Sequence, residues 1–194
     1  MKRLLFSFIL GLSFVAIVSG QTRNPTNYWA YTDTVSFTIT RPSNATTYAA
    51  NDVVTTTDTT FVKFTPVNRN LGGGGLIFAA LLEADTANVA NATFRLYVFR
   101  DTSSSQGAAI SRIGDNAAFT WLTDYRYKLV GTIDFSLSTA GTGSTSAYSY
   151  ISGFTNPFIT NINSRYLYGQ LVATGAYQPK NGGKFYIKLW ILKD

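Results

Sequence analysis

The chain has 194 residues and a formal net charge of +6, and it contains no His and no Cys. Without Cys it can form neither a disulfide nor a thiolate metal site, and without His it can form no Ser–His triad. Glu83 is the single glutamate, so an acid pair for hydrolysis is hard to assemble. We therefore expect no enzymatic activity, no catalytic residues, no cofactor and no metal site.

Residues 1–20 have the pattern of a secretory signal peptide. Lys2 and Arg3 precede an apolar run, Leu4–Val18, and small residues stand just before Gln21. The run is shorter than the roughly 20 apolar residues that span a bilayer. We expect a leader that is cleaved before Gln21. A retained hydrophobic anchor, which would be the chain's only contact with a membrane, and a misassigned start remain alternatives.

Beyond the leader, short alternating runs predict strands. In Val35–Thr40 the odd-numbered positions are apolar, which predicts a strand with one face on a core. Four consecutive glycines, 72–75, predict a loop. The following segment, Leu76–Ala84, is apolar on both faces, which predicts a strand that is covered on both sides.

Two later segments, Thr93–Arg100 and Gly183–Lys193, also alternate and carry aromatic residues on their second face. Short strands with turn residues at regular spacing continue to the C-terminus. This pattern predicts an all-β fold, a single antiparallel β-sandwich of jelly-roll or immunoglobulin-like type. We place an N-terminal arm at 21–34 and the sandwich domain at 35–194.

Aromatic residues share strand faces at a spacing of two, for example Tyr148 with Tyr150. Such rows fit three interpretations: the rim of a tyrosine-rich core, the centre of a protein interface, or a surface that stacks on sugar rings. The candidate interface residues are Tyr97, Phe99, Tyr166, Tyr168, Tyr186 and Trp190.

Other polar motifs are weaker. Asn44 and Asn91 each begin an Asn-X-Thr triplet and are candidate glycosylation sites. Glu83 and Asp85 would share a strand face; a solvated strand end is favoured there over carboxylate chemistry or a calcium ion. Lysines near the C-terminus predict a solvated edge, and we expect no nucleic-acid binding.

Several short segments follow one another along the chain in a recognisable order. They are Tyr48–Val54, Asn70–Gly75, Leu96–Phe99, Asp115–Phe119, Lys128–Ile133, Leu167–Tyr177 and Phe185–Ile191. This succession resembles a group of small virion structural proteins of tailed bacteriophages. The resemblance implies a non-enzymatic β-sandwich that forms homo-oligomers and binds other virion proteins of the capsid or tail, as a decoration or fibre-like protein. It carries over no catalytic residues.

The expected location is therefore the virion. The leader departs from that group, whose members normally lack one, and it favours an alternative. In the alternative, the chain is a secreted or cell-surface β-sandwich module, released by cleavage before Gln21, that polymerises or binds a glycan or protein ligand.

Overall fold

The computed structural model describes residues 31–56, 61–64, 66–101, 113–120, 127–139 and 143–193, without the side chain of Tyr31. The expected leader, 1–20, lies outside these residues, as does most of the expected arm. The strands are β1 (Tyr31–Thr40), β2 (Val53–Val54), β3 (Val62–Phe64), β4 (Gly74–Ala84), β5 (Thr93–Phe99), β6 (Leu129–Ser136), β7 (Ser138–Thr139), β8 (Ala147–Ile159), β9 (Leu167–Ala173) and β10 (Lys184–Lys193), with a 3₁₀ helix, η2, at Ala87–Val89.

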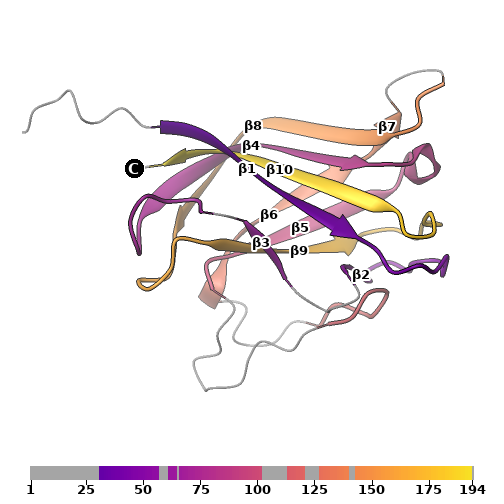
Figure 1. The fold of residues 1–194 in the computed structure, drawn as a ribbon, viewed down its shortest axis with the longest axis horizontal. Coiled ribbons are helices and arrows are strands. Elements are labelled where there is room, and N and C mark those ends of the chain that lie inside the picture. The colour runs from indigo at the N-terminus through magenta and orange to yellow at the C-terminus, as the bar shows by residue number, and fades with distance from the viewer. Residues whose placement is uncertain are drawn as a thin grey trace, which may run out of the picture.

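The strands form two antiparallel sheets that lie one above the other (Figure 1). The first, called here the β10 sheet, has the order β1-β10-β4-β8-β7. The second, called the β9 sheet, has the order β2-β9-β5-β6, and β3 also pairs with β9. The predicted all-β antiparallel sandwich is confirmed.

The strand pairs are nested along the chain. β1 pairs with β10, β2 and β3 pair with β9, β4 pairs with β8, and β5 pairs with β6. The chain is thus one long hairpin, and two further pairings, β10 with β4 and β9 with β5, wrap it into two sheets. This is the double Greek key of a jelly roll. Of the two sandwich types that the sequence left open, the strand order is that of the jelly roll.

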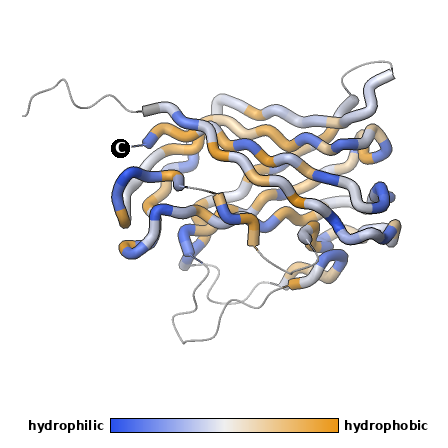
Figure 2. The backbone as a smooth tube through the Cα atoms, in the orientation of Figure 1, coloured by the Kyte–Doolittle hydropathy of each residue, from blue (hydrophilic) through white to orange (hydrophobic). Residues whose placement is uncertain are grey.

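Period-two alternation explains why β1 and β10 form strands. Val35 and Ile39 of β1 are buried, and their neighbours Thr34, Ser36 and Thr38 are exposed. The same change of hydropathy from residue to residue can be followed along the tube in Figure 2. β1 begins at Tyr31, upstream of the expected start at Val35.

The glycine segment differs from the expected loop, because β4 already begins at Gly74. A Cβ atom on Gly75 would lie 2.5 Å from the carbonyl oxygen of Leu192 and 2.7 Å from the Phe158 ring. Glycine is therefore required where β4 passes between β10 and β8. The sequence pattern indicated a flexible loop, whereas the packing requires a residue without a side chain at Gly75.

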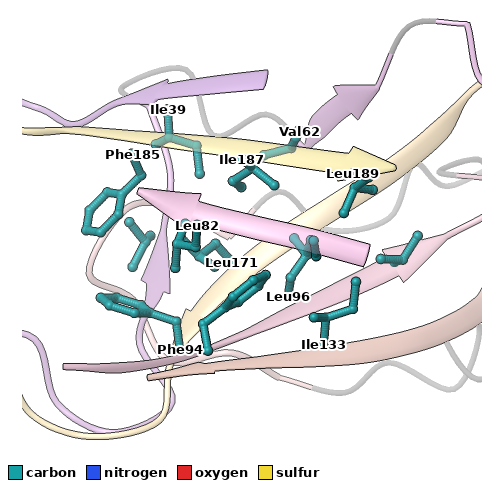
Figure 3. Packing of buried hydrophobic residues seen from close by; sticks show 14 of the residues in the cluster. Ile39, Val62, Leu82, Phe94, Leu96, Ile133, Leu171, Phe185, Ile187 and Leu189 are labelled. Atoms are coloured by element: carbon teal, nitrogen blue, oxygen red, sulfur yellow. The ribbon is translucent and has the colours of Figure 1, made fainter. Parts of the chain in front are cut away.

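Apolar side chains from both sheets fill the space between them (Figure 3). Phe94 of β5 and Phe185 of β10 meet edge to face with ring centroids 5.2 Å apart. Leu96, Leu82 and Ile187 are fully buried in the same cluster. Each such side chain contributes about 1.5–3 kcal/mol to folding through burial.

A buried ion pair ties the loops together at one end of the sandwich. Arg41 Nη2 lies 3.2 Å from Asp115 Oδ2, and their side chains are 0% and 5% exposed. Between them, Tyr48 accepts a hydrogen bond from Arg41 Nε and donates one to Asp115 Oδ1. Burial, together with the neighbouring Asp115, raises the pKa of Tyr48, so the phenol keeps the proton that it donates. The backbone N–H of Thr55 also donates to Asp115 Oδ1.

Candidate protein interface

The outer surface of the β10 sheet carries a group of aromatic residues. The cross-strand register sets three outward rows over β1, β10, β4 and β8. We call this surface the aromatic face; its rows are Thr38-Tyr186-Glu83-Tyr148, Ser36-Lys188-Leu81-Tyr150 and Thr34-Trp190-Ala79-Ser152.

The aromatic side chains of this face support one another. Tyr150 and Trp190 meet at a right angle with centroids 5.5 Å apart. Lys188 Nζ lies 5.8 Å from the centroid of the Trp190 ring. Tyr148, Tyr150 and Tyr186 are 39%, 54% and 39% exposed. Several rings of this strand-paired sheet are thus held in place and remain open to solvent.

This combination is suited to binding another molecule. Tyr and Trp are enriched at the centres of protein interfaces, where they bury large areas at low cost in conformational entropy. The same rings could stack on sugars, so the glycan-binding interpretation from the sequence applies to the same surface.

Two of the predicted interface residues are placed elsewhere. Tyr97 and Phe99 point to the outer side of the β9 sheet, but they are 8% and 0% exposed. Phe119, from the loop 113–120, stacks on Tyr97 at 4.7 Å, and Phe61 packs edge to face on Phe99 at 6.0 Å. Ile113 completes this second, smaller cluster. The chain itself therefore covers this part of the β9 sheet.

Two further predicted interface residues lie in or next to β9. Tyr168 of β9 packs against the small cluster around Phe99. Tyr166, just before β9, lies beneath Lys63, whose Nζ is 3.8 Å from the centroid of the Tyr166 ring. Of the six predicted interface residues, only Tyr186 and Trp190 lie together on the aromatic face.

The structure adds Tyr148, Tyr150 and Leu81 to those two residues. The spacing of two in 147–152 identified the tyrosine pair as sharing a strand face, but it gave no partner strand. Pairing of β8 with β4, and of β4 with β10, brings these distant segments side by side. A long-range register of this kind has no signal in a single sequence.

The other polar candidates are separate from this face. Asn44 is exposed, and its Oδ1 accepts a hydrogen bond from Arg41 Nη2. Asn91 is exposed and has a positive φ of 69° after η2. Asp85 Oδ2 lies 3.8 Å from Lys180 Nζ at the end of β4. Glu83 lies in the aromatic face, between Tyr186 and Tyr148.

Other kinds of site have less support. An open depression of about 330 Å³ lies at the edge between β6 and β8, and its lining is mainly apolar apart from Arg100. It lacks the convergent polar groups that fix a small ligand.

In the described part of the chain, no group of three His, Cys, Asp or Glu side chains could hold a metal ion. Nor does any helix among those residues have the length and apolar character of a membrane span.

No protein-family model matches this sequence, and no curated protein matches it. Among solved structures, it is similar to the cyanophage Pam1 capsid asymmetric unit (11% identity, 90% of this chain and 94% of that chain, TM-score 0.37). It is also similar to the tomato aspermy virus structure (9%, 97% and 95%, TM-score 0.30) and to an adhesin domain of Lys-gingipain from Porphyromonas gingivalis (9%, 69% and 63%, TM-score 0.28). The jelly-roll assignment follows from the strand order of this chain and not from these low-scoring similarities.

Proposed function

We propose that this chain is a non-enzymatic structural protein of a virus particle, one that self-associates and binds a capsid or tail lattice as a decoration or fibre-like protein. Its double Greek key supports this function, because jelly rolls are a common architecture of viral capsid domains. Lectins and cupins use the same architecture, so the fold by itself does not distinguish a virion protein from a ligand-binding protein.

The interior of the roll favours a structural role over an internal ligand site. Phe94, Leu96 and Ile187 are fully buried where the two sheets face each other. A ligand in that space would have to displace side chains that stabilise the fold. Function is thus expected at the surface.

The observation that carries the proposal is the aromatic face. Its rings stand on β8 and β10, two strands of a four-strand surface, and the partly exposed Glu83 carboxylate and Lys188 ammonium lie among them. A flat surface of this composition is suited to another protein surface, because it offers apolar area, hydrogen bonds and charges across a wide area. A small ligand generally needs a concave site.

Mass spectrometry of density-purified particles, with cell-free supernatant as the comparison, tests the virion role. Stoichiometric recovery of the chain in particles supports the proposal, and the first peptide shows whether residues 1–20 are removed. Recovery only as soluble or filamentous material that begins at Gln21 would reject it.

That second outcome would support the alternative, a secreted or cell-surface module. The leader pattern favours this alternative, and Tyr150 and Trp190 are placed where a sugar ring could stack. Retention on a glycan array that is lost in Trp190→Ala, with the chain absent from particles, would identify such a module.

A further inference from the structure

We infer that the aromatic face binds the same face of a second copy of this chain, across a two-fold axis that runs parallel to the strands between β10 and β4. This inference deepens the proposed self-association and rests on it in part, because it names the surface and the partner.

Side-chain sizes on the face are self-complementary about this axis. The rotation places β10 of one copy over β4 of the other, and β1 over β8. The small Thr38 and Ser36 then face the bulky Tyr148 and Tyr150. Large side chains thus meet small ones in each of these pairs, as interdigitation of two packed sheets requires.

The charges are self-complementary too. The rotation brings Lys188 of one copy within one row, roughly 7 Å along the strands, of Glu83 of the other copy. A lysine side chain can span that distance, and the symmetry repeats the pair. Within the described residues neither Glu83 nor Lys188 forms an ion pair in its own chain.

The sequence of β4 points the same way. Its apolar residues on both faces predict a strand with two covers. One face, with Leu82 and Ala80, is buried in the core. On the other face Ala79 is 1% exposed, whereas Leu81 remains partly exposed. A second copy would cover Leu81.

The available area fits a weak dimer. Four strands spaced about 4.8 Å apart, each with the five residues that the three rows span at about 3.3 Å per residue, give a projected area of about 300 Å². A corrugated surface has more accessible area than its projection. Standard interfaces bury about 800 Å² per partner and weak, transient ones bury less, so we expect a dimer in equilibrium with the monomer.

Charge reversal in trans tests this arrangement. Sedimentation equilibrium of the full chain should show a monomer–dimer equilibrium, and Glu83→Lys or Lys188→Glu alone should weaken it at least about tenfold by placing like charges in both symmetric pairs. An equimolar mixture of the two variants should recover association to near the parent level. Recovery on mixing cannot come from repair within one chain, because each chain keeps its own mutation.

The matched controls are Asp134→Lys and Arg95→Glu, which reverse the same charges on the β9 sheet and should leave the dimer constant unchanged. Circular dichroism and thermal unfolding check that every variant folds. A parent chain that stays monomeric at all concentrations, single variants that dimerise as the parent does, or folded variants that do not recover on mixing would each overturn the inference.

The outcome is separable from that of the proposed function. A chain that is found in particles but fails the charge-reversal test keeps its virion role and loses this interface. A chain that passes the test but is absent from particles has the dimer without the virion role. A monomer that binds glycan through Trp190 would contradict the dimer directly.

Discussion

The outer faces of the two sheets differ in what covers them. On the β9 sheet, Tyr97 and Phe99 are buried beneath Phe119 and Phe61. On the β10 sheet, Tyr186 and its neighbours remain exposed. Both faces come from strands with the same alternation of apolar residues, so alternation identifies a second face and leaves its cover unspecified.

The cover over Tyr97 comes from the loop 113–120, and the side chain of Asp115 anchors that loop. Arg41 and Tyr48 hold the carboxylate from one side, and the Thr55 backbone binds it from another. A buried charge thus positions an apolar cover. The open face has no equivalent loop among the described residues.

The largest expected effect comes from removing that anchor. Asp115→Ala leaves the Arg41 guanidinium buried without its carboxylate, which should lower the free energy of unfolding by about 3–5 kcal/mol. Urea unfolding measures the loss, and binding of a hydrophobic dye should rise as the cover over Tyr97 loosens. Asp115→Asn, which keeps one of the two oxygen acceptors, should lose less. A loss below about 1 kcal/mol for Asp115→Ala would show that the pair does not hold the cover.

The next effect is from the covered face itself. Phe99→Ala removes a fully buried ring from the small cluster and should cost about 3–4 kcal/mol of stability. Self-association should stay unchanged once the variant is folded at low temperature. A near-neutral result in the same urea assay would mean that the cover is loose in solution.

Trp190→Ala should have the reverse profile. The ring is partly exposed, so unfolding free energy should fall by no more than about 1 kcal/mol, while the dimer constant should weaken at least about tenfold. Sedimentation and thermal unfolding of one sample measure both quantities. An unfolded Trp190→Ala variant would instead place this ring among the residues that stabilise the fold.

The smallest effect concerns two exposed ion pairs, one on each sheet. A hydrogen bond from Lys193 holds the pKa of Asp33 below its ordinary 3.8, and Arg95 does the same to the pKa of Asp134. Each carboxylate therefore stabilises the fold above about pH 4, and this contribution is lost as pH falls through the lowered pKa. Because the carboxylates are 40% and 62% exposed, each contribution is below about 1 kcal/mol. In acid titrations of stability, Asp33→Asn and Asp134→Asn should each flatten the fall below pH 4 slightly; an unchanged curve would contradict the pairing.

The sequence predicted the sandwich because period-two alternation is a local property. Val35 and Ile39 of β1 are buried as expected, and the jelly roll was one of the two types considered. The interface was predicted in part, since Tyr186 and Trp190 share a face. Tyr97 and Phe99 have the same local pattern, yet Phe119 covers Tyr97 and Phe61 covers Phe99. Covers and registers depend on contacts between residues far apart in the chain, which local patterns do not encode.

The nested hairpin has a consequence for synthesis. β1 pairs with β10 along its whole length, and β10 separates β1 from β4. Until β10 has left the ribosome, the Thr-rich β1 lacks the strand that it pairs with in this sheet. Loop closure across the whole sandwich makes this pairing late and slow. The surface that spans β1, β10, β4 and β8 therefore forms only after β10 has been synthesised, which would keep nascent copies from associating through it earlier.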